Sequence, residues 1–118
     1  MGQIKTRRVK IPIYHGTLVV HVFSNDEERK VLELKYSIDE SQAYSGMFFP
    51  RHDKLGFTRY IICLSSNCNY RDIVHECVHF MNAVFSDRGI TLDPYNDEPQ
   101  AYFMGWAFKQ CELIFDKK

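Results

Sequence analysis

The sequence predicts an α+β domain: a small, mostly antiparallel sheet with one short helix, followed by two long helices packed together on it. The first half of the chain holds short apolar runs bounded by turn residues. The second half holds two long segments with helix start and stop signals. With 118 residues, 45% hydrophobic and 25% charged, the chain is expected to form a single globular domain over residues 1–118.

The predicted sheet begins with a hairpin. Val9, Ile11 and Ile13 alternate with other residues, Gly16 marks a turn, and residues 17–23 are rich in β-forming types. Pro12 has no backbone N–H to donate, so the first strand is expected at a sheet edge.

A short helix and two further strands should follow. Ser24 and Glu27 match a capping box, which predicts a helix that ends near Tyr36. Residues 44–49 and 57–64 are expected to be strands on either side of a polar turn, the second of them buried because it contains a continuous apolar run.

Two long helices are predicted in the second half. The first starts at Asn67 or Asn69 and runs to about Asp87, with Gly89 placed to end it. The second starts at residues 96–99, where a capping Asn or Asp precedes Glu98 and a proline, and it runs to about Phe115.

The first of these helices contains a metal-binding pattern. Residues His75-Glu76-Cys77-Val78-His79 match His-Glu-x-x-His, which places the two imidazoles one turn apart on one helix face. The apolar residues of the helix fall on the opposite face, so one side suits the core and the other suits a zinc ion. Glu76 lies about 60° from His79, where it would reach an activated water rather than the metal.

A third ligand is expected from the second long helix. A catalytic zinc takes three protein ligands, and Glu98, in the first turn, is the candidate if the two helices fold back on each other. Ala101 and Gly105 beside it are small and would allow close approach, and Tyr102 could reach into the site. The other interpretation of Glu98 is an acidic residue favoured there by the helix dipole.

The motif at 75–79, followed by Asp97-Glu98-Pro99-Gln100-Ala101-Tyr102, resembles the gluzincin-type zinc metallopeptidases, in which a Glu on a later helix is the third ligand. The resemblance covers roughly residues 70–110. The plan of the chain is similar to that of minimal single-domain members and small phage-type metallopeptidases. Many gluzincins carry an Asp where this sequence has Tyr102, so the partner of the ligand histidines is open between Asp72 and Asp97.

The predicted function is therefore a zinc-dependent peptidase, a hydrolase acting on a peptide or protein substrate. His75, His79 and Glu98 would hold Zn²⁺, Glu76 would act as general base, and Tyr102 would stabilise the oxyanion. An extended substrate is expected to pair with a sheet edge beside the first long helix. Three alternatives remain: a non-catalytic zinc-containing binding or regulatory module, a DNA-linked regulator, and a structural site that adds Cys63 and Cys68 to the histidines.

Charge and cysteine content bound the remaining expectations. Fifteen Lys and Arg balance fifteen Asp and Glu, so no general attraction to nucleic acid or to a membrane is expected. No apolar stretch is long enough to span a bilayer and no secretory signal is recognisable, which predicts a cytoplasmic protein with its four cysteines reduced. The oligomeric state does not follow from the sequence.

Overall fold

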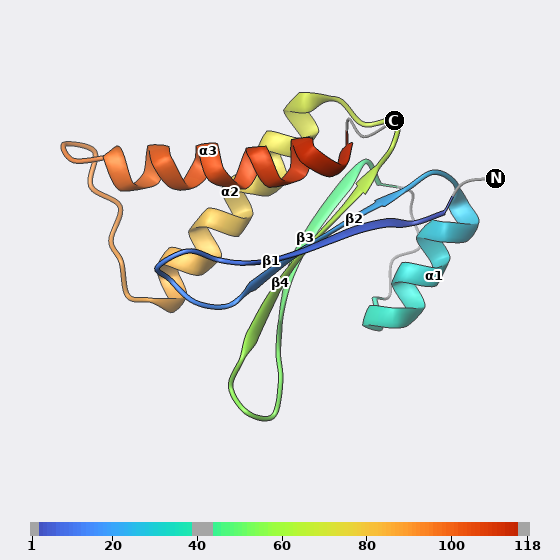
Figure 1. The fold of residues 1–118 in the computed structure, drawn as a ribbon, viewed down its shortest axis with the longest axis horizontal. Helices are drawn as coiled ribbons and strands as arrows, with labels where there is room; N and C mark the ends of the chain where they lie inside the picture. The colour runs from blue at the N-terminus through green and yellow to red at the C-terminus, as the bar shows by residue number, and fades with distance from the viewer. Residues whose placement is uncertain (1–2, 39–43, 116–118) are drawn as a thin grey trace.

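The computed structural model describes residues 3–38 and 44–115 and has the expected α+β class. Its elements are β1 (Lys5–Lys10), β2 (Thr17–Phe23), α1 (Asp26–Tyr36), β3 (Gly46–His52), β4 (Thr58–Ser65), α2 (Tyr70–Asp87) and α3 (Glu98–Phe115). The strands form one sheet in the order β1-β2-β4-β3 (Figure 1). The β1–β2 and β3–β4 pairs are antiparallel and the central β2–β4 pair is parallel, so the sheet is mixed.

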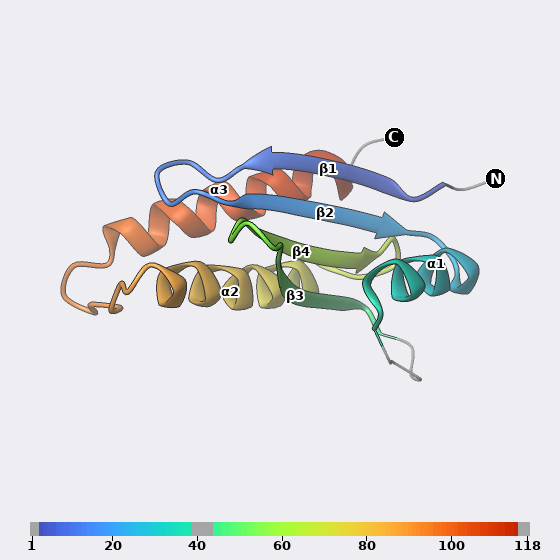
Figure 2. The same cartoon turned by 90° about the horizontal axis from the view of Figure 1, so that it is seen from below.

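Helices cover both faces of the sheet. Helices α2 and α3 lie on one face and α1 lies on the other, as the two views show (Figures 1 and 2). Because side chains of a strand alternate between faces, each central strand contributes to two separate cores. The larger core joins α2 and α3 to the sheet through Leu18, Val20, Val22, Tyr60, Ile62 and Leu64. The smaller core joins α1 to Val19, Phe23, Ile61 and Cys63.

The first strand lies earlier in the chain than the sequence predicts. The ladder of β1 with β2 ends at Lys10, and residues beyond it form a turn in which Ile13 has a φ of 69° and is exposed. Pro12 explains the difference, because it cannot donate a ladder hydrogen bond and so ends the strand instead of sitting within it. The expected position of the strand at the sheet edge is confirmed.

The starts of the helices follow local capping chemistry. Asn69 caps α2 in a capping box with Asp72, as one of the two predicted starts requires. Helix α1 is capped by Asn25, whose side chain accepts from the Glu28 N–H, one residue later than the predicted box. Its end near Tyr36 and the bounds of α3 agree with the prediction.

Two further expectations are met within the described residues. None of the helices there combines the length and apolarity that crossing a bilayer requires. All four cysteines are free thiols, although the Sγ atoms of Cys77 and Cys111 lie 3.9 Å apart between α2 and α3.

Candidate metal centre

Helix α2 presents His75 and His79 to solvent on the face opposite its core residues. Ile73, Phe80 and Val84 are fully buried on the core side, whereas both histidines are exposed. The spacing of four residues brings the imidazoles together, with ring centroids 4.8 Å apart. The helix therefore divides into an apolar side and a polar side, as its sequence predicts.

The distance between the two imidazole nitrogens is suited to a shared metal ion. The Nε2 atoms of His75 and His79 lie 3.2 Å apart. Two nitrogens bound to one tetrahedral zinc at about 2.05 Å would lie about 3.3 Å apart. The pair thus has the separation that two ligands of one zinc ion need.

Glu76 is buried beside this pair, against the edge strand β3. Only 7% of the surface of Glu76 is exposed. A Cβ atom added to Gly46, at the start of β3, would lie 3.0 Å from the Glu76 Cγ and 3.3 Å from its Oε2. A larger residue at position 46 would therefore crowd the Glu76 side chain, and this role of Gly46 gives no signal in the sequence.

The surroundings of Glu76 change its acidity. Burial raises the pKa of its carboxyl group above the ordinary value, the neighbouring His75 and His79 oppose this rise, and Asp72 adds to it. A carboxylate with a raised pKa accepts a proton more readily near neutral pH. The site thus combines two exposed imidazoles with a partly desolvated carboxyl group.

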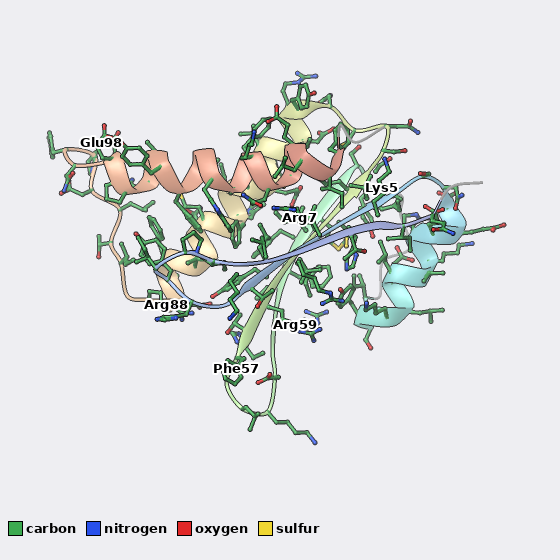
Figure 3. The ribbon with its side chains drawn as sticks, viewed as in Figure 1. Lys5, Arg7, Phe57, Arg59, Arg88 and Glu98 are labelled. Carbon is green, nitrogen blue, oxygen red and sulfur yellow. The ribbon has the colours of Figure 1, made fainter. Side chains whose placement is uncertain are left out.

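The structure does not bring Glu98 to the histidine pair. Glu98 is exposed at the start of α3, at one end of the molecule (Figure 3). Helix α3 packs through Phe103, Ala107 and Cys111, which lie about 140° to 220° around the helix from Glu98. Accordingly, the residues that the structure describes contain no group of three or more His, Cys, Asp or Glu side chains that could hold a metal ion.

The small residues next to Glu98 do not approach α2 as expected. Ala101 and Gly105 are exposed, and a Cβ atom added to Gly105 would meet nothing within 4 Å. Tyr102 is 76% exposed on the same side of α3. The face that carries these residues is therefore the outer face of α3, and the roles of Glu98 as ligand and Tyr102 as oxyanion donor stay predictions.

Neither of the two aspartates considered as partners of the histidines is placed to orient them. The Asp72 carboxylate accepts the backbone N–H of Asn69 in the helix cap. Asp97 is exposed in the connector immediately before α3. Among the described residues, no hydrogen bond joins Asp72 or Asp97 to His75 or His79, whose Nε2 atoms face each other instead.

A site built from two cysteines and two histidines is not formed. Cys63 is buried on the α1 side of the sheet, in the smaller core, whereas α2 lies on the opposite side. Burial raises the pKa of the Cys63 thiol to about 12, and the nearby Glu76 charge adds to the rise, so the thiolate needed for metal binding is disfavoured. This alternative is wrong because the strand alternation separates Cys63 from the histidines.

Comparison with known proteins identifies no relative: no family model, no curated protein and no solved structure matches the chain.

Proposed function

We propose that the protein is a zinc-dependent peptidase whose site is built on α2 and the edge strand β3. The observation that carries this proposal is the 3.2 Å separation of the His75 and His79 Nε2 atoms, which suits two ligands of one zinc ion. Glu76, buried one residue along the helix, supplies the proton acceptor that a purely structural site would not need.

The residues divide the chemistry between them. His75 and His79 would hold the ion, and Glu98 is the third ligand that the family resemblance implies. Zinc, when bound, would supply a Lewis acid that polarises the scissile carbonyl and lowers the pKa of a water molecule. Glu76 would take the proton from the attacking water and deliver it to the nitrogen of the leaving amine.

The substrate is expected to bind along β3. This strand is at the edge of the sheet, so one row of its backbone N–H and C=O groups is not used by β4. A side chain on Gly46, at its start, would point at Glu76, since an added Cβ atom would lie 3.0 Å from the Glu76 Cγ. A peptide that extends the sheet beside β3 would therefore pass close to the proton acceptor.

The test separates metal binding from catalysis. The purified full-length protein should contain one zinc per chain by elemental analysis, and His75→Ala or His79→Ala should each remove most of it. His15→Asn, in an exposed turn of the β1–β2 connection, is the matched histidine control and should retain the ion.

Catalysis is measured by cleavage of a quenched fluorescent peptide library. Glu76→Gln should keep zinc and slow cleavage by at least about 100-fold, because it removes the proton acceptor and no ligand. Glu98→Ala tests the third-ligand role that the resemblance implies: loss of zinc supports it, and full retention assigns Glu98 to the surface. A zinc-loaded protein that cleaves no peptide, and in which Glu76→Gln changes nothing, would instead be a non-catalytic zinc-containing module.

A further inference from the structure

A basic surface lies on the face of the sheet opposite α2 and α3. Strand register places Lys10 opposite Thr17, Thr17 beside Arg59, and Arg59 opposite Arg51, so these four residues form one row across all four strands. Neighbouring strands are about 4.8 Å apart, so the row is about 14 Å long. Arg8 is on the same face, two residues before Lys10 on β1.

Helix α1 leaves this part of the face open. It packs on the other end of the same face, through Leu32 and Tyr36 against Val19, Phe23, Ile61 and Cys63. Arg8, Lys10 and Arg59 are exposed, and no ion pair joins any of them to an acidic side chain among the described residues. Their positive charges therefore face solvent.

The charges of Arg8, Arg51 and Arg59 all act on the same group, the Tyr36 hydroxyl. Burial, with a contribution from Cys63, raises the pKa of the Tyr36 hydroxyl at the end of α1, and the charges of Arg8, Arg59 and Arg51 all oppose that rise. Arg51 is held in place, since its guanidinium donates to the Tyr36 carbonyl and lies 4.5 Å from the centre of the Phe49 ring. These contacts indicate one positive region rather than scattered surface charges.

An exposed aromatic ring extends this region. Phe57 is 67% exposed at the base of the β3–β4 turn, two residues before Arg59, on the hairpin that projects away from the helices (Figure 3). Its carbonyl accepts the Asp53 N–H, so the antiparallel ladder continues to this position. The two-residue period of a strand therefore assigns Phe57 to the same face as Arg59.

We infer that this basic sheet face, formed by Arg8, Lys10, Arg51, Phe57 and Arg59, binds single-stranded nucleic acid. Single strands bind where a line of cations follows the phosphates and an aromatic side chain stacks on a base. Arginine is the cation that best matches phosphate geometry, and three of the four charges are arginines. Stacking on an exposed aromatic side chain requires an unpaired base, which favours the single strand over a duplex.

The inference depends on the sheet and not on the metal centre. The overall charge of zero did not predict it, because the sequence carries these cations in three separate segments. Acidic residues gather elsewhere, for example Asp26, Glu27 and Glu28 in the first turn of α1. Folding thus brings these cations together at one end of a sheet face whose other end is covered by α1, although the chain is neutral overall.

Fluorescence anisotropy of the full-length protein with a labelled twelve-nucleotide oligo(dT) tests the inference. Binding should weaken with salt, with a slope of log K against log salt of roughly −2 to −3 for three or four phosphate contacts. The double variant R8E/R59E should lose at least thirtyfold in affinity. Lys109→Glu, an exposed charge reversal on α3, is the matched control and should change affinity by less than twofold.

A second pair of variants tests the aromatic contact. Phe57→Ala should weaken binding by about tenfold through loss of stacking. Leu55→Ala, which is 82% exposed in the same turn, should leave binding unchanged. Circular dichroism of each variant confirms that the fold is kept.

Several results would overturn the inference. One is the absence of oligo(dT) binding at tens of micromolar protein in low salt. Another is an equal loss of affinity in Lys109→Glu and in R8E/R59E. Tighter binding to a duplex of the same length would assign the face to double-stranded nucleic acid. Tighter binding to phosphatidylserine vesicles, weakened equally by Leu55→Ala and Phe57→Ala, would assign it to a membrane surface.

Discussion

Acidification should destabilise the protein through His21, which is buried in β2. The residue is 2% exposed, and its two ring nitrogens lie 2.8 Å from the Thr6 Oγ1 and 2.6 Å from the Tyr36 hydroxyl oxygen. Burial, together with the positive charges of Lys35 and Arg8, lowers its pKa from 6.5 to about 4. The folded state therefore holds the neutral imidazole.

The sign of the effect follows from this shift. In the unfolded chain the imidazole gains its proton below pH 6.5, whereas in the folded protein it resists protonation until about pH 4. The unfolded state binds more protons in this window, so stability is full above pH 6.5 and falls as the pH drops. The loss reaches about 2 kcal/mol at pH 5 and about 3 kcal/mol at pH 4.

Urea unfolding from pH 7.5 to pH 5, followed by circular dichroism, measures this loss. His21→Gln keeps a polar side chain but cannot titrate. The pH dependence of its unfolding free energy therefore reports all the other titratable groups. The free energy of unfolding of the natural protein should fall by about 2 kcal/mol relative to the variant between these pH values. Parallel curves for the two proteins would refute the role of His21.

Three further predictions follow from the site and the core. Chelation of zinc should lower the melting temperature, because binding at a thousandfold excess over Kd adds about 4 kcal/mol to the stability of the folded state. The unfolding transition should stay cooperative, since the apolar core is complete without the ion. Loss of the helical signal on chelation would indicate a structural metal instead. Gly46→Ala should slow peptide cleavage at least tenfold with zinc content unchanged, because its methyl group would displace the Glu76 carboxyl group; unaltered cleavage would mean that this contact does not position the base. Tyr60→Phe should destabilise the fold by about 1.5–3 kcal/mol, measured by urea unfolding, since its buried hydroxyl donates to the Asp87 carboxylate at 2.6 Å; no change would show that solvent replaces the bond.

Local chemistry explains which parts of the fold could be predicted from the sequence. The start of α2 depends on Asn69 and Asp72, three residues apart, and the histidine pair depends on a spacing within one helix. The first strand was misplaced because an edge strand needs no apolar alternation, and its residues are largely charged. Such a strand can be identified only from its hydrogen-bonded pairing with β2.

The outward position of Glu98 could not be predicted because it depends on how α3 is rotated about its axis. Apolar and small residues occur around much of α3, so the hydrophobic pattern allows several faces to turn inward. Contacts with the sheet select the face of Phe103 and Ala107, which turns Glu98 outward. The basic sheet face was missed for a related reason, since strand pairing brings together residues that are far apart in the chain.

The parallel pairing at the centre of the sheet has a consequence for how the chain folds. Each antiparallel pair joins segments that are close in sequence, but Thr17 on β2 pairs with Arg59 on β4, about 40 residues further along. Bringing these strands together requires the largest loss of chain entropy in the sheet, before α2 and α3 can cover it. The contact of Val20 with Ile62 at the middle of this pair is thus expected to form in the rate-limiting step, and truncation of either side chain should slow folding more than it speeds unfolding.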